Sequence, residues 1–369
     1  MAKKIFIITG EFSGDLHASN VVRELKKINE DVIIEAVGGK NLESAGVKLF
    51  SGHDKMSAMG MNLKIILNHL LLGRRIVDYL KNEFKPDLVI LTDYGAFNLA
   101  ISKHFKKAGF KIFYFIPPQI WASRKWRLKT IKKNIDKVIT IFPFEEKFYT
   151  EAGVKSEYAG HPLIGQMANV PNKEEFFARH GLDLNKKLIS VFAGSRMFEI
   201  KFLLKIFLKA VSIIEKALPN VQFVFSHAKS LPDSAFCVPY KTIKGENQEL
   251  LALSDFAILA SGTVALEAAL YETPMVIAYR GPFLFYIIYL MVRSIKRACL
   301  VNIISDKDIV PEFLMYDCEA DKISSKVIEI MQNPEPMKQE LKEFKKLMSD
   351  KNCTAETAKI INKELMENG

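Results

Sequence analysis

Asp93 is the side chain whose type and position best suit acid–base chemistry. It directly follows Leu88–Thr92, a run of five apolar or β-branched residues typical of a buried parallel strand. A carboxylate there is costly to bury unless it opens onto a crevice, where it can accept a proton from a bound hydroxyl group. Asp93 is therefore a candidate general base. The alternative is a loop residue bonded to the backbone before Asn98.

A polar loop after the first apolar run is a second candidate site. Lys4–Thr9 predicts a strand, a helical pattern starts at Leu16, and between them lies Gly10-Glu11-Phe12-Ser13-Gly14-Asp15. The loop matches neither the dinucleotide fingerprint nor the P-loop nor the hydrolase elbow. Loops at the carboxyl ends of strands line the ligand crevice of open α/β sheets. The alternative is a tight turn in which Ser13 or Asp15 caps the helix.

The second half of the chain contains two stretches suited to binding an anion. Gly194-Ser195-Arg196 combines an accessible backbone with a hydroxyl group and a guanidinium. Ser261-Gly262-Thr263 opens a predicted helix, whose first amides and dipole favour negative charge. Glu267 lies about one turn further on, within reach of a ribose diol. Either stretch alone could be a plain turn or cap, but together they predict a nucleotide site.

Other polar residues give no comparable signal. His17, His161 and His227 are possible acids or bases, although lone histidines in turns are more often structural. No grouping of histidines and carboxylates has metal-ligand spacing, so we expect no bound metal. Four cysteines are far apart, and we interpret them as reduced thiols of a cytosolic protein: Cys237, Cys299, Cys318 and Cys353.

Composition indicates a globular protein with an anionic partner. The 369 residues are 49% hydrophobic, enough for two domains, and the net charge is +10. This charge favours a phosphorylated ligand, an acidic membrane surface or nucleic acid. The basic stretch 124–133 could suit RNA. We favour a solvated helix face or one near anionic lipid, and expect no nucleic-acid partner.

The elements that position these residues alternate between strands and helices. Such alternation predicts an α/β fold with doubly wound parallel sheets. The pattern pauses near Gly160-His161-Pro162-Leu163, and Asn169–Asn172 is the predicted linker between two Rossmann-like domains with a deep cleft between them. The predicted strands are Lys4–Thr9, Val32–Val37, Leu88–Thr92, Lys111–Ile116, Lys137–Ile141, Lys187–Phe192, Val221–Phe225, Phe256–Ala260 and Met275–Tyr279.

Two apolar segments with adjacent cations suggest contact with a membrane surface. Met56–Leu72 precedes Arg74 and Arg75, and Phe283–Val292 is followed by further basic residues. Neither reaches the roughly 20 residues of a spanning helix. They are either core helices or interfacial patches whose cations meet anionic headgroups. Because the chain enters a strand almost at once, we expect no secretory signal peptide.

The order and spacing of these motifs resemble the lipid-A-disaccharide synthases. The resemblance covers residues 3 to about 315, and this many motifs in order make it specific. It rests on Gly10–Asp15, Asp93 with Phe97-Asn98, Pro118-Gln119-Ile120-Trp121-Ala122, Phe142-Pro143-Phe144-Glu145, Gly160-His161-Pro162-Leu163, Gly194-Ser195-Arg196, Ser261-Gly262-Thr263 through Leu266-Glu267, Val301-Asn302 and Val310-Pro311-Glu312.

The resemblance implies a GT-B glycosyltransferase that needs no cofactor. Such an enzyme joins UDP-2,3-diacylglucosamine to 2,3-diacylglucosamine 1-phosphate (lipid X), inverts the anomeric centre and releases UDP. The implied domains are an N-terminal acceptor and membrane-associating domain (1–168) and a nucleotide-sugar-binding domain (169–344). A C-terminal helix (345–369) packs back on the first domain. A homodimer is left open.

Site residues follow from matching positions. Asp93 resembles the base for the acceptor 6-hydroxyl, Arg196 the residue facing the diphosphate, Glu267 the ribose partner, and Asn302 a further donor-site residue. With the nucleotide assigned to the second domain, the opening loop becomes part of the acceptor wall. Its polar contacts would then be Glu11, Ser13 and Asp15.

Acylated substrates imply a cytoplasmic enzyme that is peripherally associated with the inner membrane. The expected membrane contacts are Leu67, Leu70, Leu71, Phe283 and Phe285. The alternatives are a UDP-N-acetylglucosamine 2-epimerase or another GT-B enzyme acting on soluble sugars. A peripheral membrane or RNA-binding protein without catalysis is a third hypothesis.

Four residues depart from the family's usual pattern. Phe12 replaces a usual alanine, Ala96 a common aspartate, Ser123 a usual second tryptophan and Met315 a frequent glutamine. These differences bear on acceptor or acyl-chain preference more than on the reaction.

Overall fold

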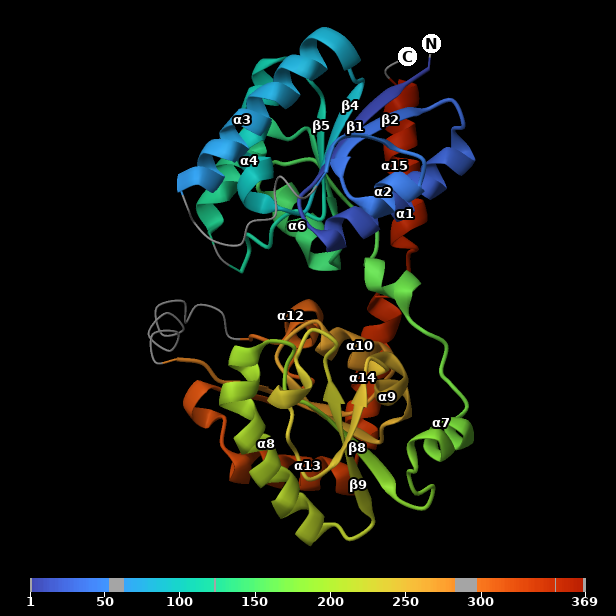
Figure 1. The fold of residues 1–369 in the computed structure, drawn as a ribbon, viewed down its shortest axis with the longest axis vertical. Coiled ribbons are helices and arrows are strands. Elements are labelled where there is room, and N and C mark those ends of the chain that lie inside the picture. Colours follow the sequence, from blue (N-terminus) through green and yellow to red (C-terminus); the bar gives the residue numbers. More distant parts are fainter. Residues whose placement is uncertain (1, 53–62, 123, 283–296, 349, 368–369) are drawn as a thin grey trace. The chain divides into compact units, whose positions relative to one another are not determined.

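The apolar runs of the two chain halves form two separate parallel sheets in the computed structural model of the protein (Figure 1). One unit contains Met1–Gly165 and Met348–Gly369, and the other contains Gln166–Leu347. The structure describes residues 2–52, 63–122, 124–282, 297–348 and 350–367, and in residues 63–68 and 235 it describes the backbone only.

The sheet of the first unit has seven parallel strands in the order β3-β2-β1-β4-β5-β6-β7. The order reverses between β1 and β4, as in a doubly wound Rossmann-like sheet. This confirms the predicted fold class for this half of the chain. The strands are β1 (Lys4–Thr9), β2 (Ile33–Gly38), β3 (Lys48–Gly52), β4 (Leu88–Thr92), β5 (Ile112–Phe115), β6 (Lys137–Thr140) and β7 (Ser156–Tyr158).

Helices cover both faces of this sheet. In β1, Ile5 and Ile7 point into one hydrophobic cluster, and Phe6 and Ile8 into another, because successive strand residues face opposite sides. The helical segments are α1 (Phe12–Ile28), α2 (Lys40–Ser44), α3 (Leu63–Tyr79), η2 (Leu80–Phe84), α4 (Gly95–Lys107), η3 (Lys125–Arg127), α5 (Leu128–Asn134), α6 (Pro143–Glu151), η4 (Pro162–Gln166) and α15 (Cys353–Glu367).

The last helix of the chain belongs to this first unit, as expected of the fold. Helix α15 packs along α1, with Ile361 and Leu365 buried in the same cluster as Val22 and Leu25 (Figure 1). Burying a side chain of this size contributes about 1.5–3 kcal/mol. The cluster therefore ties the C-terminal segment firmly to the N-terminal sheet.

The second unit repeats the architecture with six parallel strands in the order β10-β9-β8-β11-β12-β13. The order again reverses at the centre, between β8 and β11, in the arrangement of a Rossmann sheet. The strands are β8 (Lys187–Phe192), β9 (Val221–His227), β10 (Lys241–Lys244), β11 (Phe256–Ala260), β12 (Met275–Tyr279) and β13 (Glu312–Leu314).

The helices of the second unit also lie on both faces of their sheet. Helices α8 and α13 pack against each other, and α10 contacts α9 and α12 (Figure 1). The helical segments are α7 (Lys173–His180), α8 (Met197–Ala217), η5 (Asp233–Ala235), α9 (Asn247–Leu253), α10 (Val264–Leu270), α12 (Leu300–Ser305), η6 (Met315–Asp317), α13 (Ala320–Gln332) and α14 (Glu335–Met348).

The four strands that the apolar pattern did not predict are β3, β7, β10 and β13. They are the outer strands of the two sheets. An outer strand has a single neighbour and is less completely covered, so it can carry polar residues, as Lys241–Lys244 does. A search for continuous apolar runs therefore finds central strands and misses outer ones.

Of the predicted membrane contacts, Leu70 and Leu71 are described. Their exposed fractions are 58% and 52%, which excludes them from the core. The side chain of Leu67, and both Phe283 and Phe285, lie outside the described residues. Within the described ranges, no helix combines the length and hydropathy needed to cross a bilayer.

Ile361→Ala tests the contribution of α15 to the first unit. Ile361 is 1% exposed, so its truncation should leave a cavity and lower the free energy of unfolding of this unit by about 2–5 kcal/mol. Urea denaturation followed by circular dichroism measures the change. Met366→Ala, on the same helix but 69% exposed, is the matched control and should change stability by about 0.5 kcal/mol or less. Equal effects of the two substitutions would contradict the packing described for α15.

Candidate functional site

Asp93 lies at the carboxyl end of β4, where the strand order of the first sheet reverses. Asp93 and Tyr94 both have positive φ angles, 51° and 46°, which residues other than glycine rarely adopt. The carbonyl oxygen of Asp93 accepts hydrogen bonds from Asn98 Nδ2 (2.8 Å) and the Tyr114 hydroxyl (2.7 Å). These contacts stabilise a strained turn, and strained turns are common at functional sites. Both contacts are made to the backbone carbonyl of Asp93 and not to its carboxylate.

The Asp93 carboxylate is half-buried and faces helix α1. The Ser13 hydroxyl group, which belongs to the opening loop, donates a hydrogen bond of 3.5 Å to Asp93 Oδ2. Burial lowers the pKa of His17, an effect that the nearby negative charge of Asp93 opposes. Burial and the neighbouring His17 lower the pKa of His161 to about 4. At neutral pH, His161 is therefore uncharged.

Of the three predicted acceptor contacts, Glu11 and Ser13 are exposed and Asp15 is not. Asp15 is 1% exposed. Its Oδ1 accepts the Gly39 amide (2.7 Å) and its Oδ2 the Asn41 amide (2.9 Å). A side chain buried in this way has no free surface for a ligand, so we interpret Asp15 as the residue that ties α1 to the β2–α2 turn.

Gly10 is required by a close approach of Tyr94. A Cβ atom at position 10 would lie 2.0 Å from Tyr94 Cγ, so the tyrosine ring lies directly over the glycine. The Tyr94 hydroxyl also contacts His69 Nε2 at 3.3 Å. The opening loop and the Asp93–Tyr94 turn are therefore packed as one piece.

Glu145 is a buried carboxyl group near the ends of β5 and β6 that the sequence motifs left without a role. It is 1% exposed, and burial raises its pKa to about 7, against the effect of its hydrogen bonds. Trp121 Nε1 donates to Oε1 (2.9 Å), and the Ile141 and Phe142 amides donate to Oε2. Glu145 thus orients the half-buried Trp121 ring.

In the second unit, the Gly194-Ser195-Arg196 turn is occupied by an internal carboxylate. Glu199 Oε2 accepts the amides of Ser195 (2.8 Å) and Arg196 (3.2 Å). Gly194 has a φ of 123°, and a Cβ there would lie 2.4 Å from Glu199 Cβ. The two backbone amides expected to face a phosphate are therefore already bonded. The Arg196 side chain is 77% exposed, and its Nη1 lies 3.7 Å from Glu199 Oε1, so an anion would share the guanidinium with this ion pair.

The Ser261-Gly262-Thr263 turn presents more open surface. Gly262 is exposed, and a Cβ atom added to it would meet nothing within 4 Å. Glu267 is half-buried, and burial raises its pKa. No residue in the described part of the chain donates a hydrogen bond to its carboxylate. A partly dehydrated carboxylate without a donor is suited to accept hydroxyl groups of a ligand.

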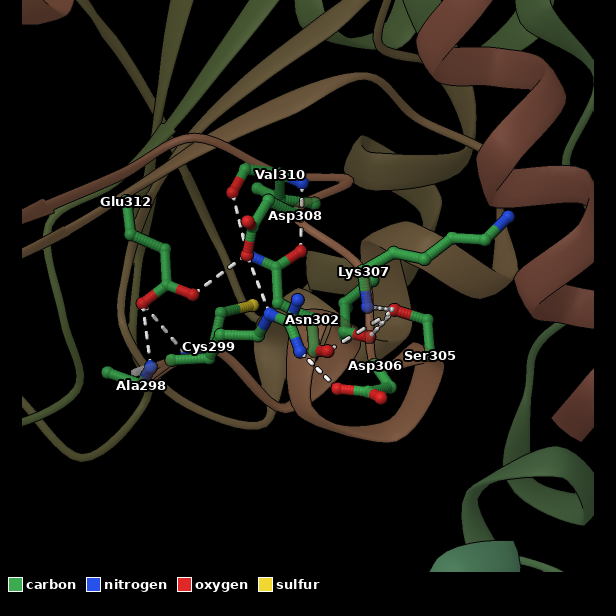
Figure 2. Close-up of polar contacts among 11 residues, drawn as sticks. Ala298, Cys299, Asn302, Ser305, Asp306, Lys307, Asp308, Val310 and Glu312 are labelled. Carbon is green, nitrogen blue, oxygen red and sulfur yellow. Dashed lines mark hydrogen bonds and ion pairs between the residues drawn. The ribbon is translucent and has the colours of Figure 1, made fainter. Parts of the chain in front are cut away.

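Asn302 is a structural residue of the α12 region. It is 1% exposed, donates from Nδ2 to Val310 O (2.7 Å) and Glu312 Oε1 (2.8 Å), and accepts the Val310 amide at Oδ1 (2.9 Å). Glu312 in turn accepts the amides of Ala298 and Cys299 (Figure 2). Because the hydrogen-bonding groups of Asn302 are used internally, its predicted contact with the donor would be indirect, through Glu312 and the loop it holds.

The structure thus brings Ser13, His17 and Asp93 together in the first unit. Sequence reasoning missed the carboxylates that hold the site loops, Glu145 and Glu199. Both are the third residue of a helix and accept amides at its start, as in a capping box. An acidic residue three positions after the N-cap residue is a recognisable signal, and it could have identified both.

Comparison with known proteins identifies relatives over nearly the whole chain. Residues 5–364 match the family model described as lipid-A-disaccharide synthetase. Lipid-A-disaccharide synthase 1 of Legionella pneumophila (strain Lens) is 36% identical over 380 residues, covering 99% of this chain and 98% of the relative. Lipid-A-disaccharide synthase of Coxiella burnetii (strain CbuK_Q154) is 35% identical over 339 residues, covering 90% and 89%.

Solved structures share the fold at low sequence identity. A putative UDP-N-acetylglucosamine 2-epimerase from Listeria monocytogenes has a TM-score of 0.66 at 12% identity, covering 100% of this chain and 98% of that one. The glycotransferase of kitacinnamycin has a TM-score of 0.66 at 11% identity, covering 99% and 100%. The Neisseria meningitidis 2-epimerase bound to UDP-GlcNAc has a TM-score of 0.60 at 14% identity, also covering 99% and 100%. These likenesses establish the GT-B type of fold.

The pKa of Glu145 predicts a titration of Trp121 fluorescence. In a Trp126→Phe background Trp121 is the remaining tryptophan of two, and its emission should move to longer wavelength with a midpoint near pH 7 as Glu145 ionises beside Nε1. His161 titrates near 4 and does not contribute there. Glu145→Gln should abolish the transition, and Glu151→Gln, exposed on the same helix, should leave it intact.

The raised pKa of Glu145 also determines how the stability of the folded chain changes with pH. The pKa of Glu145 is about 7 in the folded chain and 4.5 when exposed, so between these values only the unfolded chain releases the proton. Stability contributed by Glu145 therefore falls as the pH rises from 4.5 to about 7. A transition that survives in Glu145→Gln would assign the titration to another group.

Proposed function

Because the chain belongs to the lipid-A-disaccharide synthase family, we propose that it transfers 2,3-diacylglucosamine from its UDP derivative to 2,3-diacylglucosamine 1-phosphate, releasing UDP. The family match across residues 5–364 carries this conclusion. It makes the chain a glycosyltransferase of lipid A biosynthesis. Solved structures of 2-epimerases share the fold but are only 12–14% identical, so they do not favour that alternative.

The acceptor side of the reaction is assigned to the first unit, residues 1–168 in the proposed domain division. Asp93 supplies the base, and its position at the strand-order reversal supports the assignment. Its backbone is held by Asn98 and Tyr114, so the carboxylate is left to face a hydroxyl group. Glu11 and Ser13 are the exposed polar residues of the adjacent loop.

The donor side is assigned to the second unit, residues 169–344 in this division, while 345–369 form the returning C-terminal segment. Arg196 is exposed at the start of α8 and can pair with a diphosphate. The Glu267 carboxylate can accept hydrogen bonds from the ribose hydroxyl groups, since no described residue donates one to it. A UDP-sugar is the donor class that the family implies, and UDP-GlcNAc is bound in the Neisseria epimerase of like fold.

The reaction is a single displacement that inverts the anomeric carbon. The acceptor 6-hydroxyl oxygen attacks C1 of the donor sugar and transfers its proton to the Asp93 carboxylate. The bond between C1 and the diphosphate oxygen breaks, and its electrons leave with UDP. The guanidinium of Arg196 offsets the charge that develops on this leaving group.

Both substrates carry acyl chains, so we place the enzyme on the cytoplasmic surface of the inner membrane. Leu70 and Leu71 are exposed on α3 and precede Arg74 and Arg75. Apolar side chains beside cations suit an interface with anionic lipid. Leu67, Phe283 and Phe285 complete the proposed contact, and a homodimer is compatible with it.

Asp93→Asn and Arg196→Ala test the assigned roles. Loss of the base should lower kcat by about 10²–10⁴-fold, and loss of the guanidinium should lower it by about 10²–10³-fold. UDP release with both acylated glucosamines measures the rates, and circular dichroism checks the fold. Asp31→Asn and Arg179→Ala, exposed residues of the same types, are matched controls. Near-normal turnover in Asp93→Asn would contradict the assignment of Asp93 as the base.

Leu70→Ser combined with Leu71→Ser tests the membrane contact. Since both side chains are already exposed, the double variant should fold normally but pellet several-fold less with anionic vesicles. Leu184→Ser, at a site 50% exposed in the second unit, is the control for losing an exposed leucine. An unchanged distribution in the double variant means that these residues serve another interface.

A further inference from the structure

An apolar cavity of ≈ 390 Å³ lies between α3 and α4 of the first unit. The two helices run side by side on one face of the sheet (Figure 1). Its inner wall includes the buried side chains of Phe97 and Ile101, with Ala100 on the same helix and Gly73 and Val77 opposite. Pockets of about 300–1,000 Å³ are the usual size for small-molecule ligands.

Charged side chains are confined to the edge of this α3–α4 cavity. Arg74, Asp78 and His104 line it but are exposed to solvent, and the half-buried His69 contacts the Tyr94 hydroxyl. Phe97 and Ile101 are 6% and 3% exposed. A cavity with an apolar interior and a charged edge suits a hydrocarbon chain better than a polar ligand, since polar groups inside would lose their hydrogen bonds to water.

The cavity begins at the residue next to the proposed base. Tyr94, which follows Asp93, lines it together with Ala96 at the start of α4. From Ala96 the cavity follows α4 to His104, about 12 Å at the rise of an α-helix. Tyr94 is also packed over Gly10, so the distance between the cavity and the Asp93 turn is fixed by the fold.

We propose that the α3–α4 cavity binds one acyl chain of the acceptor sugar and so selects acceptors by chain length. This inference rests on the proposed function, because it places the acceptor hydroxyl at Asp93. An acceptor bound there has the mouth of the cavity beside it, at Tyr94 and Ala96. A membrane lipid would offer the same hydrocarbon chemistry, but it has no reason to be held at a constant distance from Asp93.

Gly73→Leu fills the cavity with little risk to the fold. Gly73 is in the middle of α3, and a Cβ atom there would make an ordinary contact of 3.6 Å with Ile101 Cδ1. Leucine is also a better helix former than glycine. Ala100→Trp narrows the cavity from the opposite helix and provides a second, independent variant. Ala217→Leu, at an exposed alanine of α8 in the second unit, is the control.

The assay keeps the UDP-sugar donor constant and varies the acyl chains of the glucosamine 1-phosphate acceptor. For the parent protein, each methylene withdrawn from the cavity should lower kcat/KM by roughly fourfold. Gly73→Leu should lower kcat/KM for the long-chain acceptor at least tenfold and leave that for the short-chain acceptor within twofold. Ala217→Leu should change neither.

An unchanged ratio of kcat/KM for long and short acceptors in both Gly73→Leu and Ala100→Trp overturns the proposal. Vesicle co-sedimentation distinguishes the two sources of hydrocarbon. If the variants lose vesicle binding while the ratio stays constant, the cavity holds a membrane acyl chain and the acceptor assignment is wrong.

Photo-crosslinking separates this proposal from the proposed function. A long-chain diacylglucosamine 1-phosphate with a diazirine on its acyl chain should label the peptide containing Tyr94–His104, and Gly73→Leu should remove the label. This readout requires no sugar transfer. Absence of UDP release with labelling at Tyr94–His104 rejects the transferase and keeps the cavity assignment, whereas absence of labelling rejects the cavity assignment.

Discussion

Parallel pairing at the centre of each sheet is the constraint on which the sites depend. In the first unit β1 pairs with β4, and Thr9 lies opposite Thr92. In the second unit β8 pairs with β11 in the same way. Because crossover connections leave in opposite directions from such a pair, the loops that follow it diverge and leave room for a ligand. The opening loop, the Asp93 turn, Arg196 and the Ser261–Thr263 turn each follow one of these four strands.

Buried or partly buried carboxylates hold the loops that leave the sheets. Each accepts two backbone amides that would otherwise lack partners at a strand or helix end, which costs less than leaving those amides unbonded. The residues are Asp15, Glu145, Glu199 and Glu312. Acidic residues near the sites thus divide into those that shape the backbone and those, such as Asp93 and Glu267, that remain available to a ligand.

The turn at Asp93 and Tyr94 connects the proposed base with the α3–α4 cavity. Two successive left-handed residues cost conformational energy, which the contacts of Asn98, Tyr114 and Gly10 offset. Asp93 then faces the α1 loop, while Tyr94 forms a wall of the α3–α4 cavity. A single strained turn therefore sets the position of the Asp93 carboxylate, the proposed base, relative to an apolar cavity.

The sequence by itself determined the central strands and the residues that follow them. Runs such as Leu88–Thr92 are apolar throughout because helices cover both faces, and a polar residue after such a run is conspicuous. Only the tertiary structure decided the strand order, the outer strands, and whether each polar side chain is buried and hydrogen-bonded or available to a ligand. The sequence predicts Asp15 and Asn302 as site residues in the same way as Asp93 and Glu267. In the structure, however, the side chains of Asp15 and Asn302 are buried and hydrogen-bonded. Their partners come from other loops of the fold, and a pattern of neighbouring residues carries no information on contacts made by packing.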